Sequence, residues 1–284
     1  MWMRRVVWAL VVGGLLLPVL ASWALRRAIN DGSVATASSL FPPDAPKVVM
    51  CAWAHPDDEI TSAGTLARMA GESGARLVLV YLTRGERAKV EGKKAEEVGR
   101  EREAEARAAG RVLGAEEVVV LGFPDGGLPG TDAMSARGAI GELIGRVRPS
   151  VVVTFDENVG FYGHPDHAQV GRWVREVVEA GAAKPEFPVR RLYQATLPGP
   201  MIDIARKHVD AFRKRYPQDP GRGLPAPTVA VRITPVAATK RALLDVHKSQ
   251  AGVVRDVQPY YDRLPSWLYY RILDREYFAL ALER

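Results

Sequence analysis

Two short clusters contain most of the side chains in this sequence that are suited to catalysis. The first is HPDDE at 55–59, directly after the apolar run VVMCAW at 48–53, and the second is HPDH at 164–167. Together they hold three of the five histidines and four carboxylates, namely His55, Asp57, Asp58, Glu59, His164, Asp166 and His167. A single aspartate of this kind could simply cap a helix, but two His-Pro-Asp clusters indicate one shared site.

A metal site explains this combination of residues. Two imidazoles and one carboxylate, with a position left open for water, form a ligand set of catalytic zinc. His55 and Asp58 are three residues apart, so both can point one way at a turn, and His167 could complete the set. Zinc with one carboxylate ligand keeps a positive charge and makes its bound water acidic. Asp57 would then be free as general base, and His164 could face a developing oxyanion as an imidazolium.

The two clusters lie about 110 residues apart, so the fold must bring them together. Strand-like apolar runs occur at 48–53, 76–82, 117–122 and 150–155, separated by segments of helical composition at 61–72, 95–113 and 135–147. Unbroken Val-rich strands that alternate with helices predict a Rossmann-like α/β fold, with a mostly parallel sheet covered by helices on both faces. Ligands bind beyond the carboxyl ends of such strands, and each cluster follows a predicted strand.

The rest of the chain gives weaker signals. We expect a helix near 167–180, strands at 190–197 and 228–234, and a last helix at about 236–249. Segments 198–227 and 250–268 are rich in Pro, Gly, Arg and Tyr, which predicts long loops.

Composition excludes several classes of protein. The chain has 284 residues, 47% of them apolar, which suits one α/β domain or two small ones. The formal net charge is +6, of which the first 31 residues carry +3, so the remainder is too weakly basic to indicate nucleic-acid binding. No G-x-G-x-x-G motif follows the first strand, which argues against a dinucleotide site. The single cysteine, Cys51, is expected to be a small buried residue.

The N-terminal segment resembles a membrane-spanning helix. Residues 6–25 carry no charge, and twenty helical residues span about 30 Å, the thickness of a hydrocarbon core. Arginine pairs flank the segment, and we expect a single-pass membrane anchor with the catalytic domain outside the cytoplasm. Secretion after cleavage of a signal peptide is the alternative, because Val19-x-Ala21 is a passable cleavage site.

Three segments are therefore predicted. Residues 1–30 form the membrane anchor or signal segment, and residues 31–46 have the small, polar, Pro-rich composition of a linker. Residues 47–284 would form the catalytic domain.

The motifs AHPDDE at 54–59 and HPDH at 164–167 resemble the two signature motifs of the LmbE-like, or PIG-L, family of zinc-dependent de-N-acetylases. The resemblance extends from about Val48 to about Gln250, with weaker matches in TRGE at 83–86, GFPDG at 122–126 and the HKSQ run that begins at His247. It implies a Rossmann-like fold and the hydrolysis of an N-acetyl group from an amino sugar, which releases acetate and a free amine.

The resemblance also implies a role for each residue that matches the motifs. The zinc ligands would be His55, Asp58 and His167, although iron(II) could occupy the same ligands. Asp57 would be the general base, His164 the oxyanion-stabilising residue, Asp166 its orienting carboxylate and Tyr162 a mobile tyrosine beside them.

Other candidates have two interpretations each. Arg84, Arg102 and His247 could bind substrate, but Arg84 could equally be a solvated loop residue and His247 a partly buried structural one. Glu59 could hydrogen-bond a metal ligand or be a charge in the first turn of a helix.

The predicted substrate is an N-acetylglucosamine-type sugar or sugar conjugate, either a small molecule or linked to a lipid. The alternative is a metal-dependent amidase or phosphoesterase that acts on a non-sugar compound. A phosphoesterase usually needs more carboxylates or a second metal ion, and this sequence offers ligands for one site.

Overall fold

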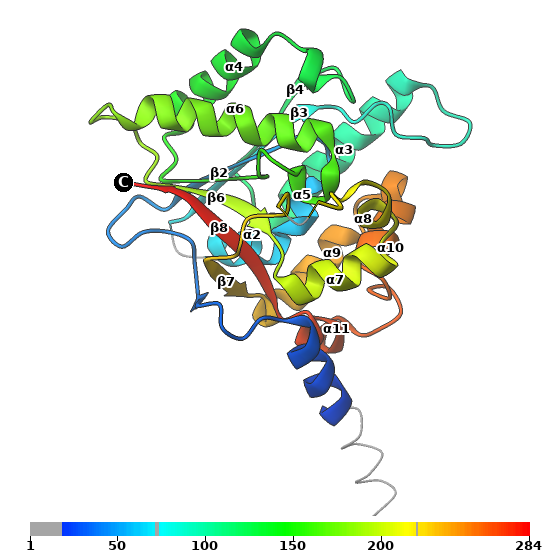
Figure 1. The fold of residues 1–284 in the computed structure, drawn as a ribbon. Coiled ribbons are helices and arrows are strands. Elements are labelled where there is room, and N and C mark those ends of the chain that lie inside the picture. Colours follow the sequence, from blue (N-terminus) through cyan, green and yellow to red (C-terminus); the bar gives the residue numbers. More distant parts are fainter. Residues whose placement is uncertain (1–18, 72–73, 220) are drawn as a thin grey trace, which may run out of the picture.

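The structure is a computed structural model that describes residues 19–71, 74–219 and 221–284. In this part of the chain one sheet contains the strands β1 (Thr36–Ala37), β2 (Val48–Trp53), β3 (Arg76–Thr83), β4 (Glu117–Phe123), β5 (Val151–Thr154), β6 (Arg191–Thr196), β7 (Val229–Arg232) and β8 (Arg275–Glu283). Their order is β1-β7-β8-β6-β5-β2-β3-β4. The predicted α/β fold is confirmed (Figure 1).

The sheet is mixed, however, and not parallel throughout. Strands β2 to β6 pair in parallel, whereas β8 runs antiparallel to both β6 and β7. Strand β8 was not predicted from the sequence. This strand directly follows a helix, and its position between β6 and β7 depends on pairing with residues about 50 to 90 positions earlier in the chain.

Side chains of β2 alternate between two hydrophobic cores. Val49, Cys51 and Trp53 pack into one core, and Met50 and Ala52 pack into the other. A strand covered on both faces must be apolar at every position, which explains the unbroken run before the first cluster. Cys51 is fully buried, as predicted.

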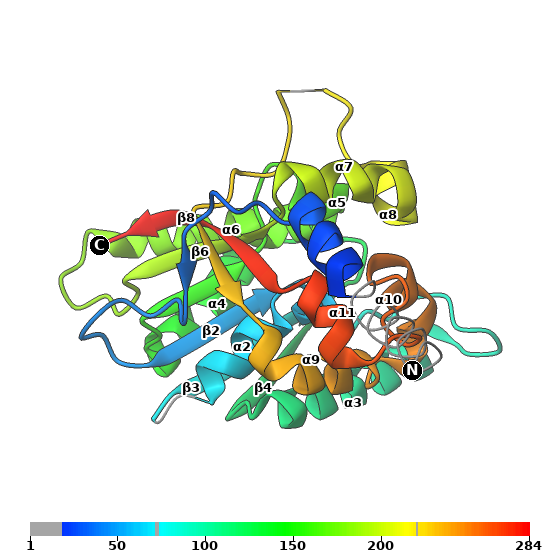
Figure 2. The ribbon, with the colours of Figure 1, turned by 90° about the horizontal axis from the view of Figure 1, so that it is seen from below.

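Helices cover both faces of the sheet. Figure 1 shows α4 (Ala133–Val147) and α6 (Pro165–Ala182) on one side, and Figure 2 shows α2 (Ala63–Ala70), α3 (Ala95–Leu113) and α9 (Ala237–Leu244) together on the other. Predicted and observed bounds of α2, α3, α4 and α6 differ by only a few residues. Gly114, at φ 69, ends α3 in the left-handed conformation that glycine adopts readily.

The prediction of long loops at 198–227 and 250–268 is wrong in part. These segments contain the short helices α7 (Gly199–His208), α8 (Asp210–Arg215), α10 (Ala251–Val257) and α11 (Ser266–Ile272). Their apolar residues are sparse along the chain but meet in space, as when Ala205, Val209, Phe212 and Tyr216 cluster with Val159 from outside these segments. Tertiary packing of this kind stabilises helices that local composition does not indicate.

The predicted helix at 236–249 is also shorter than expected. α9 ends at Leu244 and is preceded by the 3-10 helix η3 (Thr234–Val236) and followed by η4 (Lys248–Gln250). Two further 3-10 helices are η1 (Asp58–Thr61), after β2, and η2 (Leu128–Gly130), after β4.

The membrane localisation predicted from the N-terminal segment is corrected by the structure. Among the described residues, no helix is both long enough and apolar enough to cross a bilayer. Most of the predicted span, residues 6–18, lies outside the described residues. Residues 19–29 are helical and are attached to the domain, since Arg26 forms an ion pair with Asp274 at 2.7 Å and Asn30 donates to the carbonyl of Ile272.

The segment predicted as a linker contributes to the packed structure. Within 31–46, β1 pairs with β7, and Leu40 is 1% exposed in the core. The chain is therefore in contact with the domain before residue 47.

Candidate active site

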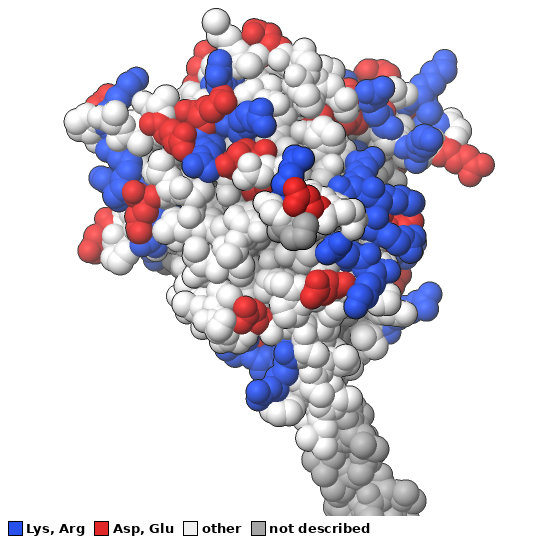
Figure 3. All heavy atoms as spheres, viewed as in Figure 1, with Lys and Arg blue, Asp and Glu red and all other residues white. Residues whose placement is uncertain are grey.

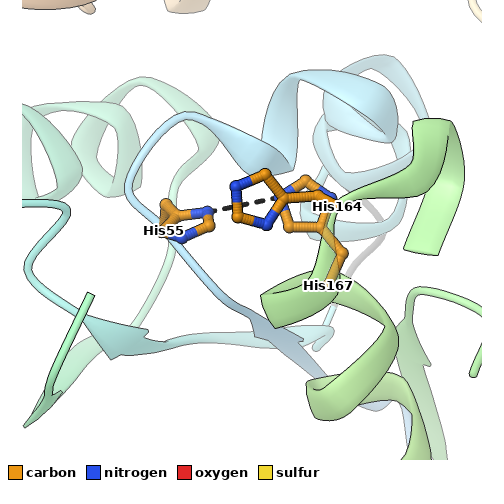
Figure 4. A group of neighbouring side chains, drawn as sticks. All are labelled: His55, His164 and His167. Carbon is orange, nitrogen blue, oxygen red and sulfur yellow. Dashed lines mark hydrogen bonds between the residues drawn. The ribbon is translucent and has the colours of Figure 1, made fainter. Parts of the chain in front are cut away.

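The two polar clusters meet at the carboxyl ends of neighbouring parallel strands. His55 to Glu59 follow β2 and enter η1, and the second cluster follows β5, through the short helix α5 (Gly160–Gly163), at the start of α6. Figure 4 shows the imidazoles of His55, His164 and His167 gathered at this point, with the two chain segments approaching from different sides. The topology thus places residues that are 112 positions apart within hydrogen-bond distance.

Three buried side chains, each with an atom that could bind a metal ion, form the centre of the site. His55 Nδ1 lies 3.2 Å from His167 Nε2 and 3.5 Å from a carboxylate oxygen of Asp58, whose other oxygen is 3.1 Å from His167 Nε2. The backbone N–H of His55 donates to the Asp58 carboxylate at 2.8 Å and orients it. The nearest nitrogen and oxygen atoms of the three residues predicted as metal ligands therefore lie within 3.5 Å of one another. Among the described residues, His55 also forms candidate metal-binding groups with His164 and His167 and with Asp125 and Asp166.

Charges around these residues shift their pKa values. Burial disfavours the charged form of Asp58, but the His167 and His55 imidazoles outweigh burial and hold its pKa well below the usual value. Burial likewise acts to lower the pKa of His55, but hydrogen bonds with Asp125, Asp166 and Asp58 raise it well above its ordinary range. The site therefore favours ionised carboxylates next to its imidazoles.

Asp125 is a site residue that was not predicted from the sequence. Its Oδ1 lies 3.1 Å from His55 Nε2, on the side of the ring opposite to Asp58, and Asp166 Oδ2 lies 3.3 Å from the same nitrogen. Backbone N–H groups of Gly126 and Leu128 donate to the Asp166 carboxylate. The GFPDG turn after β4 was the available signal, because its aspartate follows a strand of the same sheet.

Asp57 has an unusual backbone and an unusual environment. Its φ of 110° lies in the left-handed region, which non-glycine residues rarely adopt. Its carboxylate is buried, and Arg102 Nη2 lies 3.0 Å from Oδ1. Burial raises the pKa of Asp57 to about 6, although the Arg102 guanidinium acts in the opposite direction. A carboxylate with a pKa near 6 is suited to proton transfer near neutral pH.

His164 differs from the expected imidazolium. Burial and the neighbouring His167 and His55 lower the pKa of His164 to about 3, so its ring is neutral. Its Nδ1 accepts the backbone N–H of Asp166 at 3.2 Å, at the N-terminus of α6. Since a backbone N–H can only donate, the proton of the neutral ring resides on Nε2, which is left as a donor.

Tyr162 lies next to these histidines. Its ring centroid is 5.8 Å from that of His164 and 5.1 Å from that of His167. Burial is the main cause that raises its pKa above the usual value, so the phenol keeps its proton.

The predicted substrate-binding residues occupy three different environments. Arg102 is buried and donates hydrogen bonds to the carbonyls of Gly85 and Pro56. It also forms an ion pair with Asp57, so these contacts position the candidate base. Arg84 is partly exposed and forms ion pairs with Glu96 and Glu103 on α3. His247 is 1% exposed and is bonded to Glu59. Substrate binding by these residues stays a prediction.

A basic surface lies beside the site. Figure 3 shows Lys and Arg residues gathered over the region of α7, α8 and α10. α7 and α8 provide the exposed residues Arg206, Lys207, Arg213, Lys214 and Arg215, and Phe212 of α8 packs against Phe161 of α5. This surface disfavours the approach of a cationic substrate.

The profile of the PIG-L family, described as GlcNAc-PI de-N-acetylase, matches residues 50–178. The 1D-myo-inositol 2-acetamido-2-deoxy-alpha-D-glucopyranoside deacetylase of Nakamurella multipartita is 34% identical over 278 residues, covering 82% of this chain and 92% of the relative. The chain belongs to the PIG-L family. It is accordingly an N-deacetylase, a hydrolase of linear amide bonds.

Solved structures with this fold have more than one activity. The N,N'-diacetylchitobiose deacetylase of Pyrococcus horikoshii has a TM-score of 0.59 at 22% identity, covering 84% of each chain. The 4-carboxy-2-hydroxymuconate hydratase of Pseudomonas putida has a TM-score of 0.60 at 20% identity, covering 84% of this chain and 97% of the hydratase. At these identities the likeness to the solved structures shows the fold alone.

Proposed function

We propose that this PIG-L family member uses a bound zinc ion to remove the N-acetyl group from an N-acetylglucosamine-type sugar or sugar conjugate. The observation that carries the proposal is the convergence of His55, Asp58 and His167 beside an unliganded carboxylate, Asp57, whose pKa is raised to about 6. The names of the curated relatives support a glycoside of N-acetylglucosamine as substrate class. A phosphoesterase or a non-sugar amidase, the alternatives raised by the sequence, has no comparable support.

The donor geometry supports zinc. Ligand atoms about 2.0–2.1 Å from a tetrahedral zinc ion lie roughly 3.3 Å from one another. His55 Nδ1 and His167 Nε2 are 3.2 Å apart, and each lies close to one oxygen of the Asp58 carboxylate, at 3.5 Å (Oδ2) and 3.1 Å (Oδ1) respectively. Two imidazoles and one carboxylate also leave a coordination position open, as catalytic sites require. Iron(II) fits the same donors.

The residues of the site can then be given roles in amide hydrolysis. A zinc ion bound there would polarise the amide carbonyl and increase the acidity of a water molecule. Asp57 would accept a proton from the water as its oxygen bonds to the carbonyl carbon, and would later pass that proton to the departing nitrogen. His164 would donate a hydrogen bond from Nε2 to the developing oxyanion as a neutral imidazole. The carbon–nitrogen bond breaks, and acetate and the free amine are released.

Asp166 and Tyr162 support this arrangement. The Asp166 carboxylate accepts two backbone N–H groups and contacts His55, while its own N–H fixes the His164 ring. The Tyr162 hydroxyl, which keeps its proton, would be a second donor near the oxyanion.

Acetate release from a panel of N-acetylglucosamine conjugates would test the proposed function. The panel would include inositol, lipid-linked and chitobiose derivatives, and would be assayed with purified full-length protein loaded with zinc. Release of one acetate for each free amine formed is the expected result. Intact conjugates after incubation with the zinc-loaded enzyme would contradict it.

The pH dependence should follow the ionisation of Asp57. The base must be ionised to accept a proton, so we expect kcat/KM to fall as the pH decreases through about 6. Arg102 acts to lower that pKa, so Arg102→Gln should move the acid limb of the profile to higher pH. Arg100→Gln, at an exposed position of the same helix, is the control. An acid limb that is the same in all three proteins would contradict this prediction.

A further inference from the structure

The Glu59 carboxylate is completely buried next to the candidate base, and both of its oxygens have partners. Oε2 accepts the backbone N–H of Asp57 at 3.1 Å, and Oε1 lies 2.5 Å from His247 Nε2. Glu59 is 0% exposed and His247 is 1% exposed. The carboxylate therefore joins the backbone of one residue to the side chain of another that lies 190 positions later in the chain.

Asp57, whose N–H donates to this carboxylate, has a strained backbone conformation. Asp57 has φ 110° and ψ −16°, in a region where a non-glycine residue costs on the order of 1–3 kcal/mol. Such a conformation persists only when the surrounding contacts fix it. A hydrogen bond on the N–H of the strained residue fixes the direction in which its side chain leaves the turn.

His247 in turn fixes the orientation of Glu59. The imidazole lies between α9 and η4, in a part of the chain beyond the 50–178 segment that the family profile matches. Its Nε2 holds Glu59, and its Nδ1 has no hydrogen-bond partner among the described residues. A buried carboxylate without this partner would be strongly destabilised.

The turn that carries His247 is itself attached near the site. Ser249 donates from its N–H and its hydroxyl to the Glu105 carboxylate on α3, at 2.8 and 2.6 Å. Arg102, on the same helix, contacts the Asp57 carboxylate. Asp57 is therefore held at its side chain through Arg102 and at its backbone through Glu59.

We propose that Glu59 and His247 are positioning residues for the general base, with His247 acting through Glu59 to keep the Asp57 carboxylate aimed at the reacting water. The assignment depends on the proposed function, because Asp57 is a general base only if the chain hydrolyses an amide. The resulting prediction is that turnover falls when Nε2 of His247 loses its contact, while substrate affinity and metal content do not change.

Two substitutions of similar polarity would test this prediction. His247→Gln can place an amide nitrogen where Nε2 lies, and His247→Asn can place one only where Nδ1 lies. We expect His247→Gln to stay within about threefold of wild-type kcat and His247→Asn to lose roughly 10- to 100-fold, the effect of a small misplacement of a catalytic group. KM and zinc stoichiometry should be unchanged in both, and His208→Asn, at an exposed position of α7, is the control.

A double substitution tests whether His247 acts through Glu59. In protein that carries Glu59→Ala, adding His247→Asn should lower kcat no further, because the route to Asp57 is already lost. Equal kcat values for His247→Gln and His247→Asn would overturn the positioning role, and so would fully additive losses in the double variant. In either case, acetate release by the wild-type protein would leave the proposed function intact. A wild-type protein that releases no acetate would overturn both. If Glu59→Ala does not fold, the kcat values of His247→Gln and His247→Asn alone test the positioning role.

Discussion

Asp57→Asn should lower kcat by roughly 10²–10⁴, the usual contribution of general acid–base catalysis. Asparagine has the size of aspartate and keeps a carbonyl oxygen for the Arg102 guanidinium, which lies 3.0 Å from Oδ1 in this structure. It cannot accept a proton from water. The substitution therefore removes proton transfer and leaves the shape of the site, so KM and bound zinc should remain close to wild type.

The measurement is steady-state acetate release at pH 7 together with zinc content and melting temperature. Asp203→Asn, at an exposed position of α7, is the matched control and should behave as wild type. Turnover close to wild type in Asp57→Asn, with zinc still bound, would remove Asp57 from the role of base. The proton acceptor would then have to be sought among the carboxylates around His55 that are not proposed as metal ligands, namely Asp125 and Asp166.

Removal of the metal ion should abolish acetate release, and added zinc should restore it. His167→Ala should prevent this recovery, because it removes one of three donors that lie within 3.5 Å of each other. A ligand that binds only the folded state stabilises it by about 4 kcal/mol at 1,000 times its Kd. Zinc should therefore raise the melting temperature of the wild-type protein and have much less effect on His167→Ala.

The melting temperature with and without zinc can be measured before the substrate is known, so it tests the ligand role of His167 independently of activity. His208→Ala is the control, since His208 is exposed on α7 and distant in sequence from both clusters. A His167→Ala protein that retains stoichiometric zinc and the same zinc-dependent rise in melting temperature would contradict the ligand assignment. It would favour another set of possible metal ligands, His55, Asp125 and Asp166, whose ligand atoms lie within 4.8 Å of one another.

Features that depend on neighbours in the chain could be predicted from the sequence. The apolar run before His55 identified β2, because a strand covered on both faces needs an apolar residue at every position. The alternation of such runs with helices placed both polar clusters at the carboxyl ends of strands. That topology was sufficient to group His55, Asp58 and His167, since parallel strands of one sheet end at the same edge.

Features that depend on distant residues could not be predicted in this way. Contacts between segments far apart in the chain produce three such features. They are the antiparallel strand β8, the short helices at 199–215 and the attachment of residues 19–29 to the domain. The membrane assignment was made from hydropathy alone, and no helix among residues 19–71, 74–219 and 221–284 is long and apolar enough to cross a bilayer.

The chemical state of the site was also decided by the tertiary structure. The types and spacing of the residues determined which side chains could bind a metal ion and which could accept a proton. Burial and neighbouring charges, which the sequence does not show, raise the pKa of Asp57 to about 6 and lower that of His164 to about 3. Arg102, Asp125 and His247 come to their positions from three other parts of the chain. The sequence thus determined the kind of chemistry, and the fold decided the protonation and orientation of the groups that perform it, because both depend on what surrounds each group in space.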